Sequence, residues 1–258
     1  MKKKNNRMKK WMQTVAACLA VLLLGGGGLL VQQAHAVTSV VSLDVNPSIE
    51  LRVNSREKVV SCQALNQEAQ AVLEDMDGGR DLKGVKADVA VNAIVGSLVR
   101  CGYLDSLSSA ILISVEDKDQ ARAQRLQQEL TNVAGGALGN SQAAVLSQTV
   151  QQDKELEKQA KANNISTGKA ALIQEIIAQD STLTFASLAP LSVNEIALIT
   201  ESRHLTSQTV TQTGTASTKA YITAEEAKNA ALSHAGISES DVAQLEICLL
   251  YTSDAADD

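Results

Sequence analysis

Aromatic residues are scarce in this sequence: they make up 2% of its 258 residues, with one Trp and one Phe. Surfaces that bind carbohydrate or stack nucleic-acid bases need exposed aromatic rings. The composition therefore argues against both kinds of surface. The hydrophobic share of 45% and the charged share of 20% are ordinary for a globular protein with a core of its own.

Cysteine and histidine are also sparse, with four Cys and three His. Cys18 lies in an apolar segment and Cys248 in the C-terminal tail, so only Cys62 and Cys101 would be available to pair in an oxidising compartment. Two free, half-buried thiols are the interpretation that we prefer. The His residues are far apart and have no Cys or carboxylate at ligand spacing, so we expect neither a metal nor a cofactor. The sequence also lacks a G-x-S-x-G motif and a Cys/His arrangement, which argues against a multiple-turnover enzyme.

Charge is distributed unevenly along the chain, which has 23 basic and 29 acidic residues. No acidic residue precedes residue 37, whereas six basic residues do: Lys2, Lys3, Lys4, Arg7, Lys9 and Lys10. The rest of the chain is therefore strongly acidic and repels phosphate backbones, so we expect no nucleic-acid partner.

An uncharged stretch, Trp11–Val31, follows the basic cluster. Its length of roughly twenty residues is enough to span a bilayer as a helix. Because no Lys or Arg follows before Arg52, the positive-inside rule places residues 1–10 in the cytoplasm and the body outside it. This predicts a single-pass protein of the cell membrane. Ala34-His35-Ala36 also fits a signal-peptidase site, with cleavage after Ala36, although the long apolar run favours an uncleaved anchor.

The body alternates between strand and helix patterns. Short alternating segments between Thr38 and Leu65 predict a meander of three strands. Buried strands are expected at Ile111–Val115 and Val145–Val150, and helices at Gln67–Leu73, from Val85 to Val99, at 117–130, after Asp153, after Ser166 and after Ser192. This order predicts an α+β fold: a small, mostly antiparallel sheet covered by helices on one face.

Two patterns within these helices have specific interpretations. The apolar face of the Val85–Val99 helix is expected at Val85, Val89, Ile94, Leu98 and Val99. Ser166-Thr167-Gly168-Lys169 matches the end of a phosphate-binding loop, but the glycine that begins such a loop is missing. We therefore interpret the motif as a helix cap, and we expect Ser192 to cap the last helix of the body.

The C-terminal part differs from the body. Residues 204–219 are a Thr/Ser/Gln tract with the composition of a flexible linker. Thr223 and Glu226 form a capping box that opens a further helix, which Gly236 ends. Residues 248–258 resemble a translated sequencing-adapter read, so we expect an artefact there.

One short segment, Leu43–Glu50, contains Asn46-Pro47 between two predicted strands. Proline lacks a backbone donor, so it belongs at a strand edge or bend, and the residue before it is extended. From the residues alone this is a tight bend.

Residues 37–203 resemble the extracytoplasmic middle domain of RsgI-type anti-sigma factors of Gram-positive bacteria. The resemblance lies in blocks that follow the family's order and span roughly two-thirds of the chain. These blocks are Ser42–Leu51, Val59–Asn66, Leu112–Val115, Ile165–Ile173 and Leu191–Ile196. Residues 220–247 resemble the start of a PepSY-type domain, which is truncated here.

The resemblance implies a signalling role. In the family, a cytosolic domain sequesters an alternative sigma factor, the exported part senses a signal, and an intramembrane protease acts after the parts separate. Residues 1–10 are too few to fold around a sigma factor. A sigma-factor partner is therefore implied only if a cytosolic domain is missing from this chain.

The resemblance also implies self-cleavage of the Asn46–Pro47 bond. The Asn46 side-chain amide nitrogen can attack its own backbone carbonyl and expel the nitrogen of Pro47, because a fixed neighbouring group has a large effective molarity. Asp44 or Ser48 could move the proton. Apart from this single turnover, we expect no enzymatic activity.

These observations favour a membrane-anchored anti-sigma-factor-like signalling protein. The alternative is a secreted module with a PepSY-type part that binds or inhibits a protease.

Overall fold

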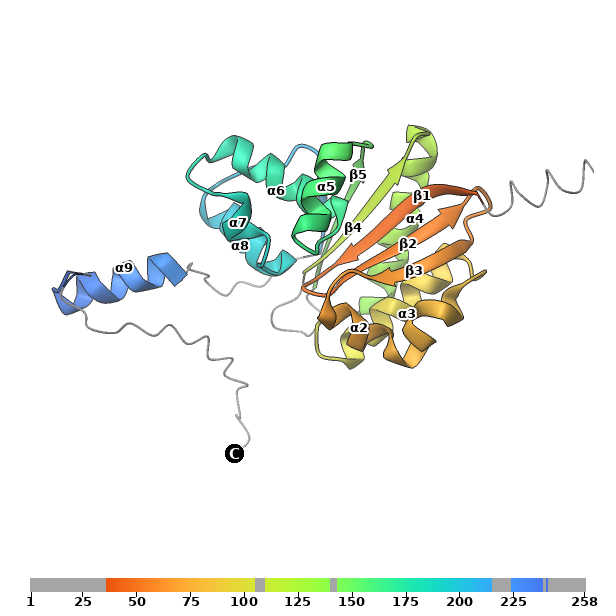
Figure 1. Ribbon diagram of the computed structural model, residues 1–258, viewed down its shortest axis with the longest axis horizontal. Helices are drawn as coiled ribbons and strands as arrows, with labels where there is room; N and C mark the ends of the chain where they lie inside the picture. The colour runs from red at the N-terminus through yellow and green to blue at the C-terminus, as the bar shows by residue number, and fades with distance from the viewer. Residues whose placement is uncertain (1–35, 105–109, 140–142, 215–223, 239, 241–258) are drawn as a thin grey trace, which may run out of the picture. The chain divides into compact units, whose positions relative to one another are not determined.

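The computed structural model describes residues 36–104, 110–139, 143–214, 224–238 and 240 (Figure 1). Contacts divide the chain into two units, 1–217 and 218–258. The described part of the second unit contains helix α9 (Ala224–Ala235), which ends at Gly236 with a φ of 67°. The predicted helix in this region is confirmed, whereas Thr223 of its predicted cap lies outside the described residues.

The first unit is built on a six-stranded sheet with the order β3-β2-β1-β4-β5-β6. The strands are β1 (Val37–Asp44), β2 (Ser48–Asn54), β3 (Val59–Ala64), β4 (Ala110–Asp117), β5 (Ala144–Val150) and β6 (Thr211–Thr213). Among the strand pairs that the structure describes, only β4–β5 is parallel, and the other four are antiparallel. The predicted meander and the mostly antiparallel sheet are confirmed. Strand β1 lies between β2 and β4 and is paired with both.

Most of the described helices begin after a residue whose side chain caps them, although α3 and η1 have no such side-chain bond. The helices are α2 (Gln67–Leu73), the 3₁₀ segment η1 (Glu74–Leu82), α3 (Ala87–Arg100), α4 (Gln120–Leu138), α5 (Lys154–Ala162), α6 (Thr167–Gln179), α7 (Phe185–Leu188) and α8 (Val193–Ser202). The side chains of Ser166 and Ser192 accept hydrogen bonds from the third residue of α6 and α8. Both predicted caps are confirmed. In each case the serine hydroxyl oxygen accepts from a backbone N–H that has no partner within the helix.

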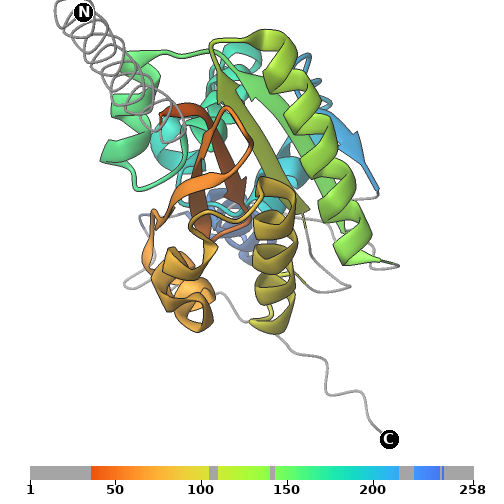
Figure 2. The ribbon, with the colours of Figure 1, turned by 90° about the vertical axis from the view of Figure 1, so that its right-hand side faces the viewer.

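Helices cover both faces of the sheet, so the prediction of helices on one face is wrong. Helices α2, α3 and α4 cover one face (Figures 1 and 2). Helix α6 packs against β1, β4 and β5, and α8 packs against β4. Successive strand residues point to opposite faces. Because Gly168 of α6 contacts Ser114, while the adjacent Ile113 belongs to the core under α3 and α4, α6 lies on the second face.

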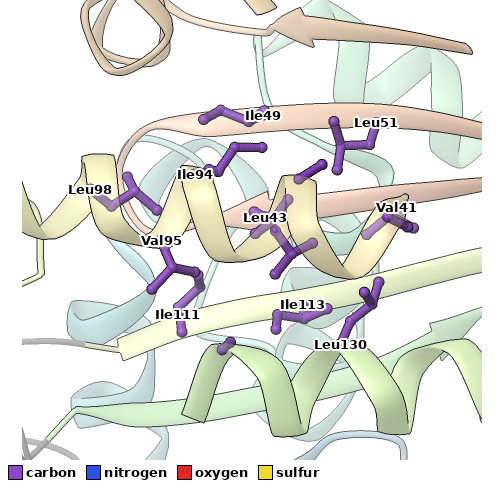
Figure 3. Close-up of a cluster of buried hydrophobic side chains, with 14 of the residues drawn as sticks. Val41, Leu43, Ile49, Leu51, Ile94, Val95, Leu98, Ile111, Ile113 and Leu130 are labelled. Carbon is purple, nitrogen blue, oxygen red and sulfur yellow. The ribbon is translucent and has the colours of Figure 1, made fainter. Parts of the chain in front are cut away.

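The first face is apolar. Figure 3 shows side chains from the strands, from α3 and from α4 meeting in one cluster. The labelled members are Val41, Leu43, Ile49, Leu51, Ile94, Val95, Leu98, Ile111, Ile113 and Leu130, all buried. The predicted α3 face is only partly right, since Val89 is 56% and Val99 45% exposed. Alanines replace them in the buried stripe, at Ala87 and Ala90.

Part of the predicted linker 204–219 is ordered against the sheet. Strand β6 pairs with β5, and Thr213 faces Val145. The carboxylate of Glu175 accepts hydrogen bonds from Ser207, Gln208 and Thr209. These bonds hold the pKa of Glu175 below its usual value although its burial acts in the opposite direction.

The predicted anchor, Trp11–Val31, lies outside the described residues, as do residues 248–258. Within the part of the chain that the structure describes, none of the helices has the length and hydrophobicity that a membrane span requires.

Candidate functional site

The Asn46–Pro47 bond lies in the short loop that joins β1 to β2. Asp44 and Ser48 are the last paired residues of the two strands, so the loop consists of Val45, Asn46 and Pro47. The backbone N–H of Val45 donates to the carbonyl of Pro47 at 3.0 Å. Asn46 is exposed and Pro47 is buried. The predicted bend is confirmed.

Asp44 lies directly before this loop and is fully buried, with 0% exposure. The Ser48 hydroxyl donates to one carboxylate oxygen at 2.6 Å, and the Ser166 hydroxyl donates to the other at 2.5 Å. Burial raises the pKa of Asp44, although both serine hydrogen bonds and the positive charge of Lys169 act against the rise. Asp44 and Ser48, which the sequence indicated, are therefore in direct contact.

Lys169 is the cationic neighbour of this carboxyl and is only 2% exposed. Its backbone N–H donates to the Ser166 hydroxyl at 2.9 Å, and its Nζ donates to the carbonyl of Leu191. Burial lowers the pKa of Lys169, while the negative charges of Asp44 and Glu195 oppose that change. A buried acid and a buried amine thus lie behind the loop.

Asn66 holds the loop from its other side. Its Nδ2 donates to the carbonyl oxygen of Asn46 at 2.8 Å. Its Oδ1 accepts from the backbone N–H of Ser48 at 3.2 Å and from that of Ala69 at 3.0 Å, which caps helix α2. In addition, the backbone N–H of Val193 donates to the carbonyl of Val45 at 2.6 Å. Both residues that precede the proline therefore have their carbonyls bound.

Gly168 explains why α6 comes so close to the sheet. A Cβ at this position would lie 2.1 Å from the Ser114 hydroxyl oxygen and 2.7 Å from that of Ser42, which is impossible without movement of the helix. The Gly168 carbonyl accepts from Gln148 Nε2 at 2.7 Å, and the same nitrogen donates to Ser114 at 3.0 Å. The missing side chain thus lets α6 bring Ser166 and Lys169 to Asp44.

The structure joins sequence motifs that lie far apart. Ser166 is 122 residues from Asp44, and the sequence indicated it only as a helix cap. Lys169 belongs to the same motif, and Asn66 is the last residue of the Val59–Asn66 block, which resembles RsgI-type anti-sigma factors. A polar residue before a predicted helix signals a cap. No local signal indicates the contacts of Ser166, Lys169 or Asn66 with the loop.

Comparison with known proteins identifies the class of this domain. The model of the anti-sigma factor RsgI-like central domain matches residues 38–175, which is more than half of the chain. The chain belongs to this family. The match ends at residue 175, so the resemblance of residues 220–247 to a PepSY-type domain stays a prediction.

Individual proteins that are similar to this chain are named as anti-sigma-I factors. Anti-sigma-I factor RsgI7 of Acetivibrio thermocellus is 27% identical over 161 residues, which are 61% of this chain and 28% of that protein. Anti-sigma-I factor RsgI6 of the same organism is 30% identical over 172 residues, 62% of this chain and 22% of that protein. Anti-sigma-I factor RsgI of Bacillus subtilis is 25% identical over 131 residues, 50% of this chain and 32% of that protein. The matched region thus covers less than a third of each of these relatives.

Proposed function

We propose that this chain belongs to a membrane-anchored, anti-sigma-factor-like signalling protein and carries its exported domain. Family membership and the names of the relatives support the signalling role. The basic cluster before Trp11 supports export of the body. In this proposal the described domain senses a signal, and a sigma factor binds to a cytosolic domain of the whole protein.

A reporter fusion tests the location of the body. An enzyme that is active only outside the cytoplasm is inserted after residue 214, and the rest of the chain is kept. We expect activity from this fusion and none from a matched fusion to a cytoplasm-active enzyme. The reverse pattern would contradict export.

We further propose that the domain cleaves itself between Asn46 and Pro47. The Asn46 side-chain nitrogen forms a bond to its own backbone carbonyl carbon, which closes a succinimide, and the bond from that carbon to the Pro47 nitrogen breaks. One proton leaves the attacking nitrogen and one reaches the Pro47 nitrogen. The products are a fragment that ends in the succinimide and a fragment that begins with a free proline amine.

The contacts of Asp44 suit it to proton transfer. The Asp44 carboxyl accepts a hydrogen bond from the Ser48 hydroxyl at 2.6 Å, and Ser48 is the residue directly after the proline. Because burial raises the pKa of Asp44, the protonated acid is favoured more than in water. We assign Asp44 and Ser48 to the delivery of a proton to the leaving nitrogen.

The observation that carries the signalling proposal is the central position of β1. Leu43 faces Ile49 in β2 and Ile113 in β4, and its side chain is buried in the apolar core. After cleavage, β1 would stay in the sheet through backbone hydrogen bonds on both sides and through this core. The two fragments would then be joined by noncovalent contacts alone. A signal that withdraws β1 would separate the fragments and expose the anchor to an intramembrane protease.

Pulse labelling of the full chain, with a tag at each end, tests the reaction. Chains made by cell-free synthesis in the presence of lipid vesicles are denatured at successive times and separated by size. We expect two fragments that accumulate with time, with the new N-terminus at Pro47. Asn46→Ala should stay intact, whereas Asn92→Ala, on the exposed side of α3, should cleave normally. A folded wild-type chain that stays intact would contradict the proposal.

A further inference from the structure

The Asn66 amide binds the carbonyl group of the bond that is proposed to break. Its Nδ2 lies 2.8 Å from the carbonyl oxygen of Asn46, across 20 residues of sequence. We propose that Asn66 is the carbonyl-binding residue of the self-cleavage reaction and stabilises the negative charge that develops on this oxygen. The inference rests on the proposed cleavage at Asn46–Pro47. It assigns to Asn66 an increase in the rate of that reaction.

The chemistry places charge where Asn66 donates. When the Asn46 side-chain nitrogen attacks, the electron pair of the carbonyl double bond moves to the oxygen. When the intermediate collapses, that pair returns and the bond to the Pro47 nitrogen breaks, as this nitrogen takes up a proton. The reaction needs no external reactant. A donor that is already in place lowers the barrier, because no reorganisation is needed while charge develops.

The orientation of the Asn66 amide is fixed by its other contacts. Oδ1 accepts from two backbone donors, Ser48 N–H and Ala69 N–H. If the amide were turned over, its NH₂ group would face these two donors and its oxygen would face the Asn46 carbonyl oxygen. That arrangement replaces three hydrogen bonds by three repulsive contacts. The donor is therefore held toward the Asn46 carbonyl.

The position of Asn66 also ties the reaction to folding. Asn66 caps α2, and α2 is anchored to α3 where the Ser97 hydroxyl donates to the carbonyl of Val72 at 2.8 Å. The donor reaches Asn46 only when β2, β3 and α2 have assembled. Cleavage should thus begin after this part of the domain has folded.

Asn66→Asp separates the two functions of the side chain. The carboxylate can still accept from Ser48 N–H and Ala69 N–H, so the cap is kept, but it cannot donate to Asn46. We expect the cleavage rate of the full chain in pulse labelling to fall by about 10²- to 10³-fold, as for loss of one donor to a developing oxyanion. In the Asn46→Ala background, in which neither chain cleaves, adding Asn66→Asp should leave the melting temperature close to that of Asn46→Ala alone.

Asn54→Asp is the matched control. The Asn54 Oδ1 accepts from the backbone N–H groups of Arg56 and Lys58 in the turn at the other end of β2. The same chemical change there should leave the cleavage rate unchanged. Asn66→Ser is a second variant, because serine is also a good helix cap but is too short to reach the Asn46 carbonyl. It should slow cleavage similarly, and it decides the test if Asn66→Asp does not fold.

The outcomes separate the two proposals. Slow cleavage in the folded Asn66 variants, with normal cleavage in wild type and Asn54→Asp, supports the role of Asn66. Cleavage of the folded Asn66 variants at the wild-type rate, with Asn46→Ala intact, overturns that role and leaves self-cleavage standing. A folded wild-type chain that never cleaves overturns both.

Discussion

The two faces of the sheet are both shielded from water, yet they are built from different residues. The face under α2, α3 and α4 is lined by aliphatic side chains (Figure 3). The face under α6 and α8 carries a group of buried polar side chains: Ser42, Asp44, Ser114 and Gln148. Both faces bury aliphatic side chains, since Leu112 and Ile173 are fully buried on the second face as well. The second face differs in its polar groups, which lie behind the β1–β2 loop.

The difference follows from what burial costs. Apolar area removed from water contributes about 25 cal/mol per Å². A buried polar group stabilises little and costs free energy when it lacks a partner. On the second face, Ser48 and Ser166 satisfy Asp44, and Ser114 and Gly168 satisfy Gln148. Substitutions on the two faces should therefore differ in size and in what they disturb. All stability measurements below use the Asn46→Ala background, so that the chain stays covalently intact.

The largest loss is expected from Ile113→Ala, on the apolar face. Ile113 is fully buried in the cluster of the apolar core, and truncation leaves a cavity. We expect the free energy of unfolding to fall by about 2–5 kcal/mol. Urea denaturation measures it. A loss below that of Ser114→Ala, its neighbour on the other face, would contradict the assignment of the two faces.

Gly168→Ala should have the next largest effect. Alanine is a better helix former than glycine by about 1 kcal/mol. The new methyl group would nevertheless lie 2.1 Å from the Ser114 hydroxyl, so steric overlap decides the outcome. We expect a net loss of about 1–3 kcal/mol. When Asn46 is restored, cleavage should also be slower, because α6 moves Ser166 away from Asp44.

Gly96→Ala is the control for this substitution. Gly96 lies in α3, and a Cβ there meets nothing within 4 Å. Helix propensity alone should then raise stability by about 0.5–1 kcal/mol. Equal changes in stability at Gly96 and Gly168 would contradict the close approach of α6 to Ser114.

Ser114→Ala should cost less. The change removes the oxygen that accepts from Gln148 at 3.0 Å, but Gln148 keeps its bond to the Gly168 carbonyl. The expected loss is about 0.5–1.5 kcal/mol by urea denaturation. A loss as large as that of Ile113→Ala would mean that the polar contacts carry the fold.

The smallest signal should be the pH dependence of Asp44, since it appears only as a difference between two profiles. Its pKa is raised from 3.8, so the folded chain keeps this proton to a higher pH than the unfolded chain. The contribution of Asp44 to the free energy of unfolding is complete below its pKa in the unfolded chain. It is lost as the pH rises through its pKa in the folded chain. Stability relative to Asp44→Asn should therefore fall as the pH rises from about 4 towards neutrality. A difference that grows with pH would contradict the raised pKa.

The secondary structure was largely readable from local patterns. Strands β1 to β3 follow alternation, and the caps at Ser166 and Ser192 follow from their side chains. The buried stripe of α3 was partly missed, because Ala87 and Ala90 carry little hydrophobic signal while Val89 and Val99 carry more and are exposed.

The second layer of helices was not predictable. Serines that alternate with aliphatic residues in a strand normally mark a solvent-exposed face. Here Ser42 and Ser114 are covered by α6, which comes close only because Gly168 has no side chain. The site depends on the same long-range packing. The loop and the Asp44–Ser48 pair lie within one segment, whereas the contacts of Ser166 and Asn66 with the loop required the fold.

The most direct test of the central claim compares one sample of the purified full chain under two conditions. Under denaturing conditions, mass spectrometry should find two fragments, one beginning at Pro47, with masses that sum to the intact chain until water opens the succinimide. In native mass spectrometry from detergent, the same sample should give a single species of the intact mass, because β1 stays between β2 and β4. An uncleaved chain in the first measurement, or separate fragments in the second, would contradict this account.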